Sequence, residues 1–212
     1  MSDQLKFIAS ILSIFTHELN NHSSIMNESA GLVLDLIEIK KGSPDCGLDQ
    51  ISSVTGGITG QIKKTTALVK YLNSFAHRMD NPLSNYNLYE VIEELIMLMN
   101  RVLNQKEITV DMDFIKDDLT VLGNPSILQY IIFSIIQGYL KCLKGGDGII
   151  INILKGESTV EIKFHHRSKQ SISFDEDIDS SDAIKQIGAS IVYGDGDTGL
   201  TLILPLTVEV TF

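Results

Sequence analysis

The chain has 212 residues, enough for one large domain or two small ones, each with its own core. Hydrophobic residues make up 43% of it, which excludes a disordered protein. The formal charge of −10 argues against nucleic acid or an anionic membrane as the main partner, because both would repel the chain. We therefore expect a protein partner, with no nucleic acid and no membrane involved.

Cysteine usage and the N-terminal segment indicate the compartment. Cys46 and Cys142 form no CxxC pair, which suits a reducing cytoplasm. The apolar run over residues 7–15 is too short to span a bilayer, and it lacks the basic start and the cleavage site of a signal peptide. We therefore expect a cytoplasmic protein.

Residues 1–81 have the pattern of two long helices. Between residues 5 and 36, apolar residues recur at alternating intervals of three and four, which is a heptad seam. Gly and Pro in the stretch 42–47 end this helix, and a second periodic run follows over residues 51–76. The seam consists of Leu5, Ile8, Leu12, Phe15, Leu19, Met26, Val33 and Leu36, with His22 and Ser29 in two of its positions.

Two long helices with a short connection predict an antiparallel hairpin. A hairpin of two helices cannot bury its own seam fully, and apolar surface around Leu12 and Leu19 would stay uncovered in a monomer. We therefore expect a homodimer in which two hairpins form a four-helix bundle.

Residues 82–212 have the mixed pattern of an α+β domain. Pro125 follows Asn124 and occupies a favourable first helical position. The pattern predicts helices packed on one face of a mainly antiparallel sheet, so the fold class of the chain is α+β. Helices are predicted at 88–103, 125–143 and 180–188, and strands at 108–114, 149–154, 160–165, near 191 and at 200–204.

His17 falls on the outer face of the first predicted helix. With Leu12 and Leu19 at heptad position a and Phe15 at d, His17 takes position f, farthest from the seam. His22 takes a d position, which should turn its ring toward the bundle. The sequence therefore predicts an exposed imidazole at His17, and a merely solvated polar residue is the alternative.

Polar residues surround His17. Asn20 and Asn21 follow it by three and four residues and share its face, and Glu18 lies beside it, where it could orient one ring nitrogen. A zinc site with His22 is excluded, because residues five apart do not share a helix face. No serine or cysteine motif of a nucleophilic hydrolase is tied to this histidine.

The stretch His17-Glu18-Leu19-Asn20-Asn21 resembles the H-box of two-component sensor histidine kinases, in which H-E-L/I-x-N/T-P contains the phosphorylated histidine. Residues 88–94 resemble the start of the GHKL-type ATP-binding domain, and residues 122–129 resemble its "v-x-G-D/N-x-x-x-L-x-Q" segment. The resemblance covers nearly the whole chain. It implies a dimerisation and histidine phosphotransfer domain at 1–81 and a GHKL-like α/β sandwich at 82–212. His22 departs from the family, which usually has a helix-bending proline there.

The residues that hold ATP in this family are not preserved. Ser134 and Gly138 stand at the two asparagines of the N-box, and glycine offers no oxygen to Mg²⁺. In the "D-x-G-x-G" segment, His166 replaces the aspartate, and Ser168 and Gln170 replace the glycines. We therefore expect no cofactor and no metal bound by this chain, and no ATP-dependent autokinase activity.

Two further segments differ from a nucleotide site. Residues 174–182 are short and acidic where the family has a glycine-rich lid, and they would repel a triphosphate. Residues 194–199 formally match GxGxxG, but they lie between two strand patterns rather than between a strand and a helix. We predict a turn there.

The resemblance and the degenerate boxes imply a stand-alone histidine phosphotransferase, with no sensor domain ahead of the hairpin. His17 would accept a phosphoryl group from a receiver-domain aspartate and pass it to another, with Mg²⁺ supplied by the partner receiver domain. Glu18 would stabilise the phosphorylated ring, and Asn20 and Asn21 would contact phosphoryl oxygens or water. Ile14 is a candidate docking contact, with burial in the core as the alternative.

Two other functions stay open. A phosphatase of a phosphorylated response regulator is one, because Glu18 and Asn21 match the pair that the family associates with that hydrolysis. A non-catalytic pseudokinase regulator, which occupies a kinase or a receiver without moving phosphate, is the other.

Overall fold

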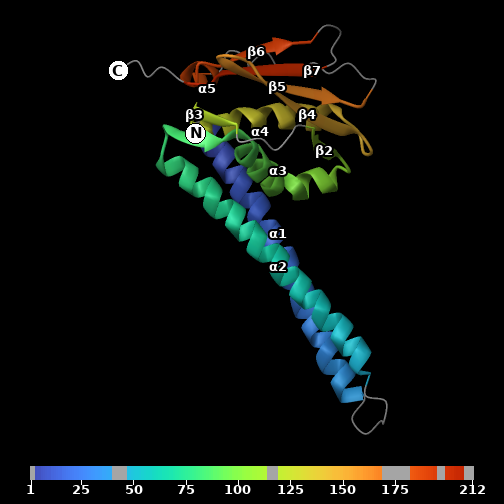
Figure 1. Ribbon diagram of the computed structural model, residues 1–212. Coiled ribbons are helices and arrows are strands. Elements are labelled where there is room, and N and C mark those ends of the chain that lie inside the picture. The colour runs from blue at the N-terminus through green and yellow to red at the C-terminus, as the bar shows by residue number, and fades with distance from the viewer. Residues whose placement is uncertain (1–2, 40–46, 114–118, 169–181, 195–198, 208–212) are drawn as a thin grey trace.

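The computed structural model describes residues 3–39, 47–113, 119–168, 182–194 and 199–207. It consists of a long helical hairpin, α1 and α2, that projects from a mixed α+β domain (Figure 1). The predicted order of a hairpin followed by a sandwich is confirmed. Over the described residues, no helix combines the length and the apolar character needed to cross a bilayer.

The hairpin pairs α1 (Asp3–Ile39) with α2 (Leu48–Asp80). The second helix begins after Gly47, whose φ of 54° is in the left-handed region that glycine enters without steric cost. The three glycines in the first half of α2 do not interrupt it, so the predicted second helix is confirmed as continuous. Of the predicted break at 42–47, only Gly47 lies within the described residues.

The two main helices of the second domain are α3 (Leu88–Gln105) and α4 (Pro125–Cys142). Asn87 caps α3 by accepting a hydrogen bond from the backbone N–H of Glu90. Asn124 caps α4 by accepting from the backbone N–H groups of Ser126 and Ile127. The predicted start of α4 at Pro125 is confirmed.

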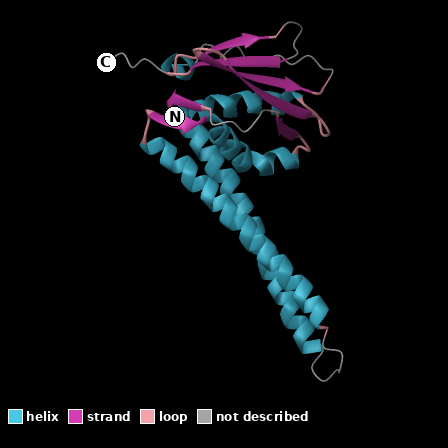
Figure 2. Ribbon diagram, in the orientation of Figure 1, coloured by secondary structure: helices cyan, strands magenta, loops and turns pink. Residues whose placement is uncertain are grey.

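The main sheet has five strands in the order β2-β4-β5-β7-β6, in which only the β2–β4 pair is parallel. Figure 2 shows α3 and α4 on one face of this sheet, between the sheet and the hairpin. The predicted mainly antiparallel sheet with helices on one face is thus confirmed. The strands are β2 (Thr109–Met112), β4 (Gly148–Lys155), β5 (Thr159–His166), β6 (Ser190–Tyr193) and β7 (Gly199–Pro205).

Three short elements complete the domain. The strands β1 (Ser84–Asn87) and β3 (Thr120–Gly123) form a separate antiparallel pair that the sequence did not reveal, because four residues show too little alternation. The short helix α5 (Asp182–Gln186) lies within the predicted helix at 180–188. The formal GxGxxG segment lies between the antiparallel strands β6 and β7, as predicted, although residues 195–198 lie outside the described residues.

The predicted heptad seam is correct for the distal part of α1 and wrong for its first turns. Leu5 and Leu12 are 52% and 46% exposed, whereas Phe7 and Ile11 are buried instead. The reason is that the first turns of α1 also contact α3 and α4, so their buried face is set by the second domain as well as by α2. Between residues 23 and 39, only the seam positions Met26, Ser29, Val33 and Leu36 are partly buried.

A cluster of aromatic rings joins the hairpin to the second domain. The ring of Phe7 lies 5.5 Å from that of Phe75 in α2, 5.8 Å from Tyr130 and 4.9 Å from Phe133, both in α4, measured between centroids. The hairpin and the sandwich therefore share one hydrophobic core.

Candidate functional site

His17 is exposed on α1, in agreement with the prediction from its heptad position. Asn20 and Asn21 are exposed on the same helix. Among the described residues, no hydrogen bond or ion pair engages the His17 ring, so its nitrogens are open to a partner. Ile14, one turn before His17, is half-buried, so its role as a docking contact stays a prediction.

His22 is buried at 7% exposure and faces the hairpin interior, as its d position predicts. Its Nδ1 lies 3.1 Å from the hydroxyl oxygen of Thr65 in α2, and its Nε2 lies 3.3 Å from Oε1 of Glu18. Both ring nitrogens thus have partners inside the protein. His17 is already exposed, so no described neighbour has to move before a partner can reach its ring. A partner could reach His22 only if the hairpin opened.

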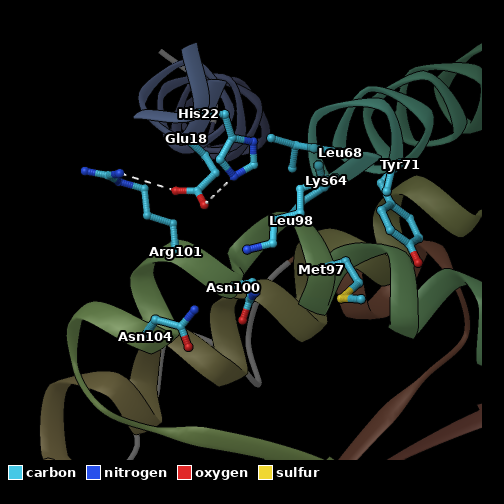
Figure 3. Close-up of a pocket in the computed structure, with 11 residues that line it drawn as sticks. Glu18, His22, Lys64, Leu68, Tyr71, Met97, Leu98, Asn100, Arg101 and Asn104 are labelled. Atoms are coloured by element: carbon cyan, nitrogen blue, oxygen red, sulfur yellow. Dashed lines mark hydrogen bonds and ion pairs between the residues drawn. The ribbon is translucent and has the colours of Figure 1, made fainter. Parts of the chain in front are cut away.

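Glu18 contacts His22 of the hairpin and Arg101 of the second domain (Figure 3). Its Oε1 lies against His22, and its Oε2 accepts a hydrogen bond of 3.3 Å from Nη1 of Arg101 in α3. Within the described part of the chain, neither carboxylate oxygen contacts His17. The expectation that Glu18 orients the His17 ring is therefore not met in this arrangement.

Arg101 is the site residue that the sequence did not reveal. It lies on α3, and its pairing with Glu18 brings together two helices that are far apart in the chain. Nothing in the local pattern around Arg101 indicates a partner, because its pair is set by the docking of α3 on the hairpin. No local signal could have identified it.

A pocket of about 320 Å³ lies where α1, α2 and α3 meet (Figure 3). Glu18 and His22 form part of its α1 wall, while His17 is not among the residues that line it. Glu18 and His22 therefore lie on the side of α1 that faces the pocket, and His17 lies on its outer side. Its other polar lining residues are Lys64, Tyr71, Asn100, Arg101 and Asn104.

A buried polar network fastens α3 to the end of the hairpin. Glu94 of α3 is 2% exposed, and its carboxylate accepts hydrogen bonds from Arg78 of α2 at 2.9 Å and from Gln129 of α4 at 3.3 Å. Burial raises the pKa of Glu94, and the neighbouring Arg78 guanidinium opposes that rise only in part. Gln129 also donates to the carbonyl of Val91, so three helices are joined at this point.

The region that corresponds to the ATP site in the family contains Gly138, Tyr139 and His166. Gly138 has no side chain to offer to a cation, and the next residue, Tyr139, is fully buried. The Tyr139 hydroxyl donates a hydrogen bond of 2.9 Å to the carbonyl of Phe164 in β5, and its ring lies 5.9 Å from that of His166. The absence of bound ATP and Mg²⁺ therefore stays a prediction, which rests on Gly138 and the replaced residues of the D-x-G-x-G segment.

The other expectations for this region have mixed outcomes. His165 is exposed and His166 half-buried at the end of β5, so this pair of histidines ends a strand. Ser134 is used within α4, where its hydroxyl donates to the carbonyl of Tyr130 at 2.9 Å. Gln170 and almost all of the acidic segment 174–182 lie outside the described residues.

The chain resembles known proteins in structure and not in sequence. No family model matches the chain, and no curated protein is similar to it in sequence. A histidine kinase from Burkholderia phymatum STM815 superposes with a TM-score of 0.50 at 11% identity, over 91% of this chain and 98% of that one. The chain has a histidine-kinase-like fold.

Two further histidine kinases are similar at lower TM-scores. The Acinetobacter baumannii histidine kinase AdeS gives 0.49 at 12% identity, over 92% of this chain and 98% of that one. The histidine kinase ThkA, in a crystal structure with the response regulator protein TrrA, gives 0.47 at 16% identity, over 97% of this chain and 64% of that one. The histidine-kinase-like fold agrees with the predicted α+β architecture and its N-terminal hairpin.

Proposed function

We propose that this protein is a histidine phosphotransferase of a two-component phosphorelay, in which His17 relays a phosphoryl group between receiver-domain aspartates. The observation that carries the proposal is the exposed His17 ring, whose nitrogens have no partner among the described residues, on the hairpin of a histidine-kinase-like fold. An imidazole in that position can approach a receiver domain without any rearrangement of the hairpin.

The reaction requires little from this chain beyond positioning. A ring nitrogen of His17 attacks the phosphorus of the receiver's aspartyl phosphate, an N–P bond forms, and the P–O bond to the aspartate breaks. The aspartate leaves as a carboxylate, and the phosphorylated ring carries the positive charge. Asn20 and Asn21 are exposed on the same helix as His17, and in this proposal they would contact phosphoryl oxygens. Mg²⁺ is expected from the partner receiver domain.

The phosphoryl group comes from a receiver and not from ATP in this proposal. This part of the proposal is supported by two residues at the position of the family's N-box. Gly138 has no side-chain oxygen for Mg²⁺, and the buried Tyr139 donates its hydroxyl hydrogen bond to the carbonyl of Phe164. A chain with this region has no evident means to phosphorylate His17 by itself.

The working unit in this proposal is a homodimer. Leu12 of α1 is 46% exposed, and Ile62 and Val69 of α2 are 51% and 38% exposed. Ile62 and Val69 are seven residues apart and share one face of α2, as Leu12 and Leu19 share one face of α1. A second hairpin that packs on these exposed apolar residues would cover them and complete a four-helix bundle.

The decisive experiment uses a receiver domain carrying a radiolabelled aspartyl phosphate. Transfer predicts label on this chain and then on a second, unlabelled receiver. Release of free phosphate without label on the chain would indicate a phosphatase instead, and label that stays on the first receiver would indicate a non-catalytic regulator.

A further inference from the structure

We propose that Arg101 determines which reaction the His17 site performs, because it holds the Glu18 carboxylate away from His17 and so favours phosphoryl transfer over hydrolysis. This inference rests on the proposed function, and it gives the second domain a role in that function through Arg101 of α3. Arg101 is a positioning residue here, since it acts through Glu18 and does not contact the phosphoryl group.

The geometry accounts for both oxygens of the Glu18 carboxylate. Oε2 accepts the hydrogen bond from Nη1 of Arg101 at 3.3 Å, and Oε1 lies 3.3 Å from Nε2 of His22 (Figure 3). His22 is in turn held at its other nitrogen by Thr65. The carboxylate is thus anchored from α3 on one side and from the hairpin interior on the other.

The side chains of His17 and Glu18 point to different sides of α1. Consecutive residues on a helix are rotated by about 100°, so Glu18 reaches the pocket wall between α1 and α3 while His17 stays on the outer face. To act on a phosphoryl group at His17, Glu18 has to leave Arg101 and enter another side-chain rotamer. The ion pair with Arg101 opposes that change.

The two competing reactions differ in what they need from Glu18. In transfer, the nucleophile is a ring nitrogen of His17, which carries its own electron pair. In hydrolysis, the nucleophile is water: its oxygen attacks phosphorus, the P–O bond to the receiver aspartate breaks, and a general base takes the proton that the water loses. The products are inorganic phosphate and the receiver carboxylate. Glu18, the carboxylate next to His17 in the chain, is the base in this proposal, and because only hydrolysis needs a base, its position affects hydrolysis more than transfer.

The Glu18–Arg101 ion pair is expected to favour transfer over hydrolysis modestly and not to prevent hydrolysis completely. The two side chains are 27% and 26% exposed, so solvent screens the pair in part. Partly exposed ion pairs shift an equilibrium between two arrangements by a factor of roughly two to five. Loss of the Arg101 guanidinium is expected to raise the population of released Glu18 by about that factor.

The second domain should stay docked when Arg101 is replaced. The Phe7 aromatic cluster and the hydrogen bonds from Arg78 and Gln129 to Glu94 join the hairpin to α3 and α4 independently of Arg101. A change in the reaction can therefore be separated from loss of the fold. Circular dichroism and elution volume of each variant should equal those of the wild type.

The test measures free phosphate and label on His17 from the same radiolabelled phosphoreceiver. Arg101→Ala is expected to raise the ratio of free phosphate to label on His17 by about threefold, within the range expected for a partly exposed ion pair. Arg101→Lys, which keeps a cation near Glu18, is expected to bring the ratio closer to that of the wild type.

Two comparisons decide whether the effect passes through Glu18. The double variant Arg101→Ala with Glu18→Gln is expected to lose the gain in free phosphate, because an amide is no base. The matched control is Arg167→Ala, which removes a different arginine ion pair of the second domain, a more exposed one in which Nη2 of Arg167 lies 2.7 Å from Oδ2 of Asp111. It is expected to leave the ratio unchanged.

Three outcomes would overturn the inference. An unchanged ratio in Arg101→Ala shows that Arg101 does not set the balance, and a raised ratio that persists in the double variant shows that Glu18 is not the agent. A wild-type protein that takes up no label on His17 overturns the proposed function first, and this inference with it.

Discussion

The ring of Phe7, near the start of α1, lies 4.9 Å from the ring of Phe133 in α4, so the N-terminus of the hairpin is part of the core of the second domain. Phe7 is 3% exposed, and its ring also meets Phe75 of α2 edge-on. Because of this contact, the hairpin and the sandwich stabilise each other.

Replacement of Phe7 should therefore destabilise both parts of the chain. Phe7→Ala is expected to lower the free energy of unfolding by about 3–5 kcal/mol, because it leaves a cavity among Phe75, Tyr130 and Phe133. Chemical denaturation followed by circular dichroism measures the change. As a control, Leu154→Ala removes a side chain that is 49% exposed in β4 and should cost less than about 1 kcal/mol. Equal effects of the two variants would contradict the shared core.

The apolar face of the hairpin predicts a dimer that a single charge can disrupt. Light scattering should give about twice the chain mass of 23.4 kDa, because Leu12, Ile62 and Val69 would otherwise stay in water. Val69→Glu places a carboxylate on this face and should shift the protein toward the monomer. Val192→Glu, at a 51% exposed position of β6, should leave the mass unchanged. A monomeric wild type would contradict the proposed dimer.

The residues that stand where histidine kinases have their ATP site predict no specific ATP binding. Gly138 offers no oxygen to Mg²⁺, and the buried Tyr139 is held to Phe164 by its hydroxyl. Calorimetric titration with ATP and Mg²⁺ should show no saturable heat, whereas a histidine kinase with intact boxes should show it under the same conditions. Saturable binding would show that the positions of the ATP-site residues were assigned wrongly, and autokinase activity would then have to be tested.

The long elements and the outer face of α1 could be predicted from the sequence. Helix periodicity over many residues identified α1 and α2, and the pair Asn124-Pro125 marked the start of α4. Heptad position placed His17 outside and His22 inside.

The predictions that failed concern residues whose surroundings are set by segments far away in the chain. Phe7 is buried and Leu12 exposed because the second domain covers the first turns of α1, which no local period can indicate. Arg101 was missed for the same reason, since its partner Glu18 is brought to it only by the docking of α3. The strands β1 and β3 are too short to have a pattern.

Glu94 predicts a specific pH dependence of stability. Burial raises the pKa of its carboxyl above the ordinary value of 4.5, so folding favours the protonated form. The stabilisation from protonated Glu94 is complete below pH 4.5 and is lost as the pH rises through the raised pKa. Denaturation over a pH series should show wild-type stability falling, with rising pH, relative to Glu94→Gln.

The control for Glu94 is on the same helix. Glu93→Gln changes a half-buried carboxylate, and its stability should follow the wild type over the whole pH series. A difference between wild type and Glu94→Gln that does not change with pH would show that Arg78 and Gln129 fully offset the burial of Glu94.

His17→Ala should abolish acceptance of the phosphoryl group and leave the fold intact. The exposed ring makes no hydrogen bond or ion pair among the described residues, so the free energy of unfolding should change by less than about 0.5 kcal/mol. Transfer needs the ring nitrogen, and neither Asn20 nor Asn21 can form the N–P bond. His22→Ala is the matched control: it removes the buried imidazole beside Glu18 and Thr65, so it should lower stability but retain the label. Label lost in His22→Ala and kept in His17→Ala would move the phosphoacceptor to His22. An unfolded His17→Ala protein would show instead that the histidine has a structural role.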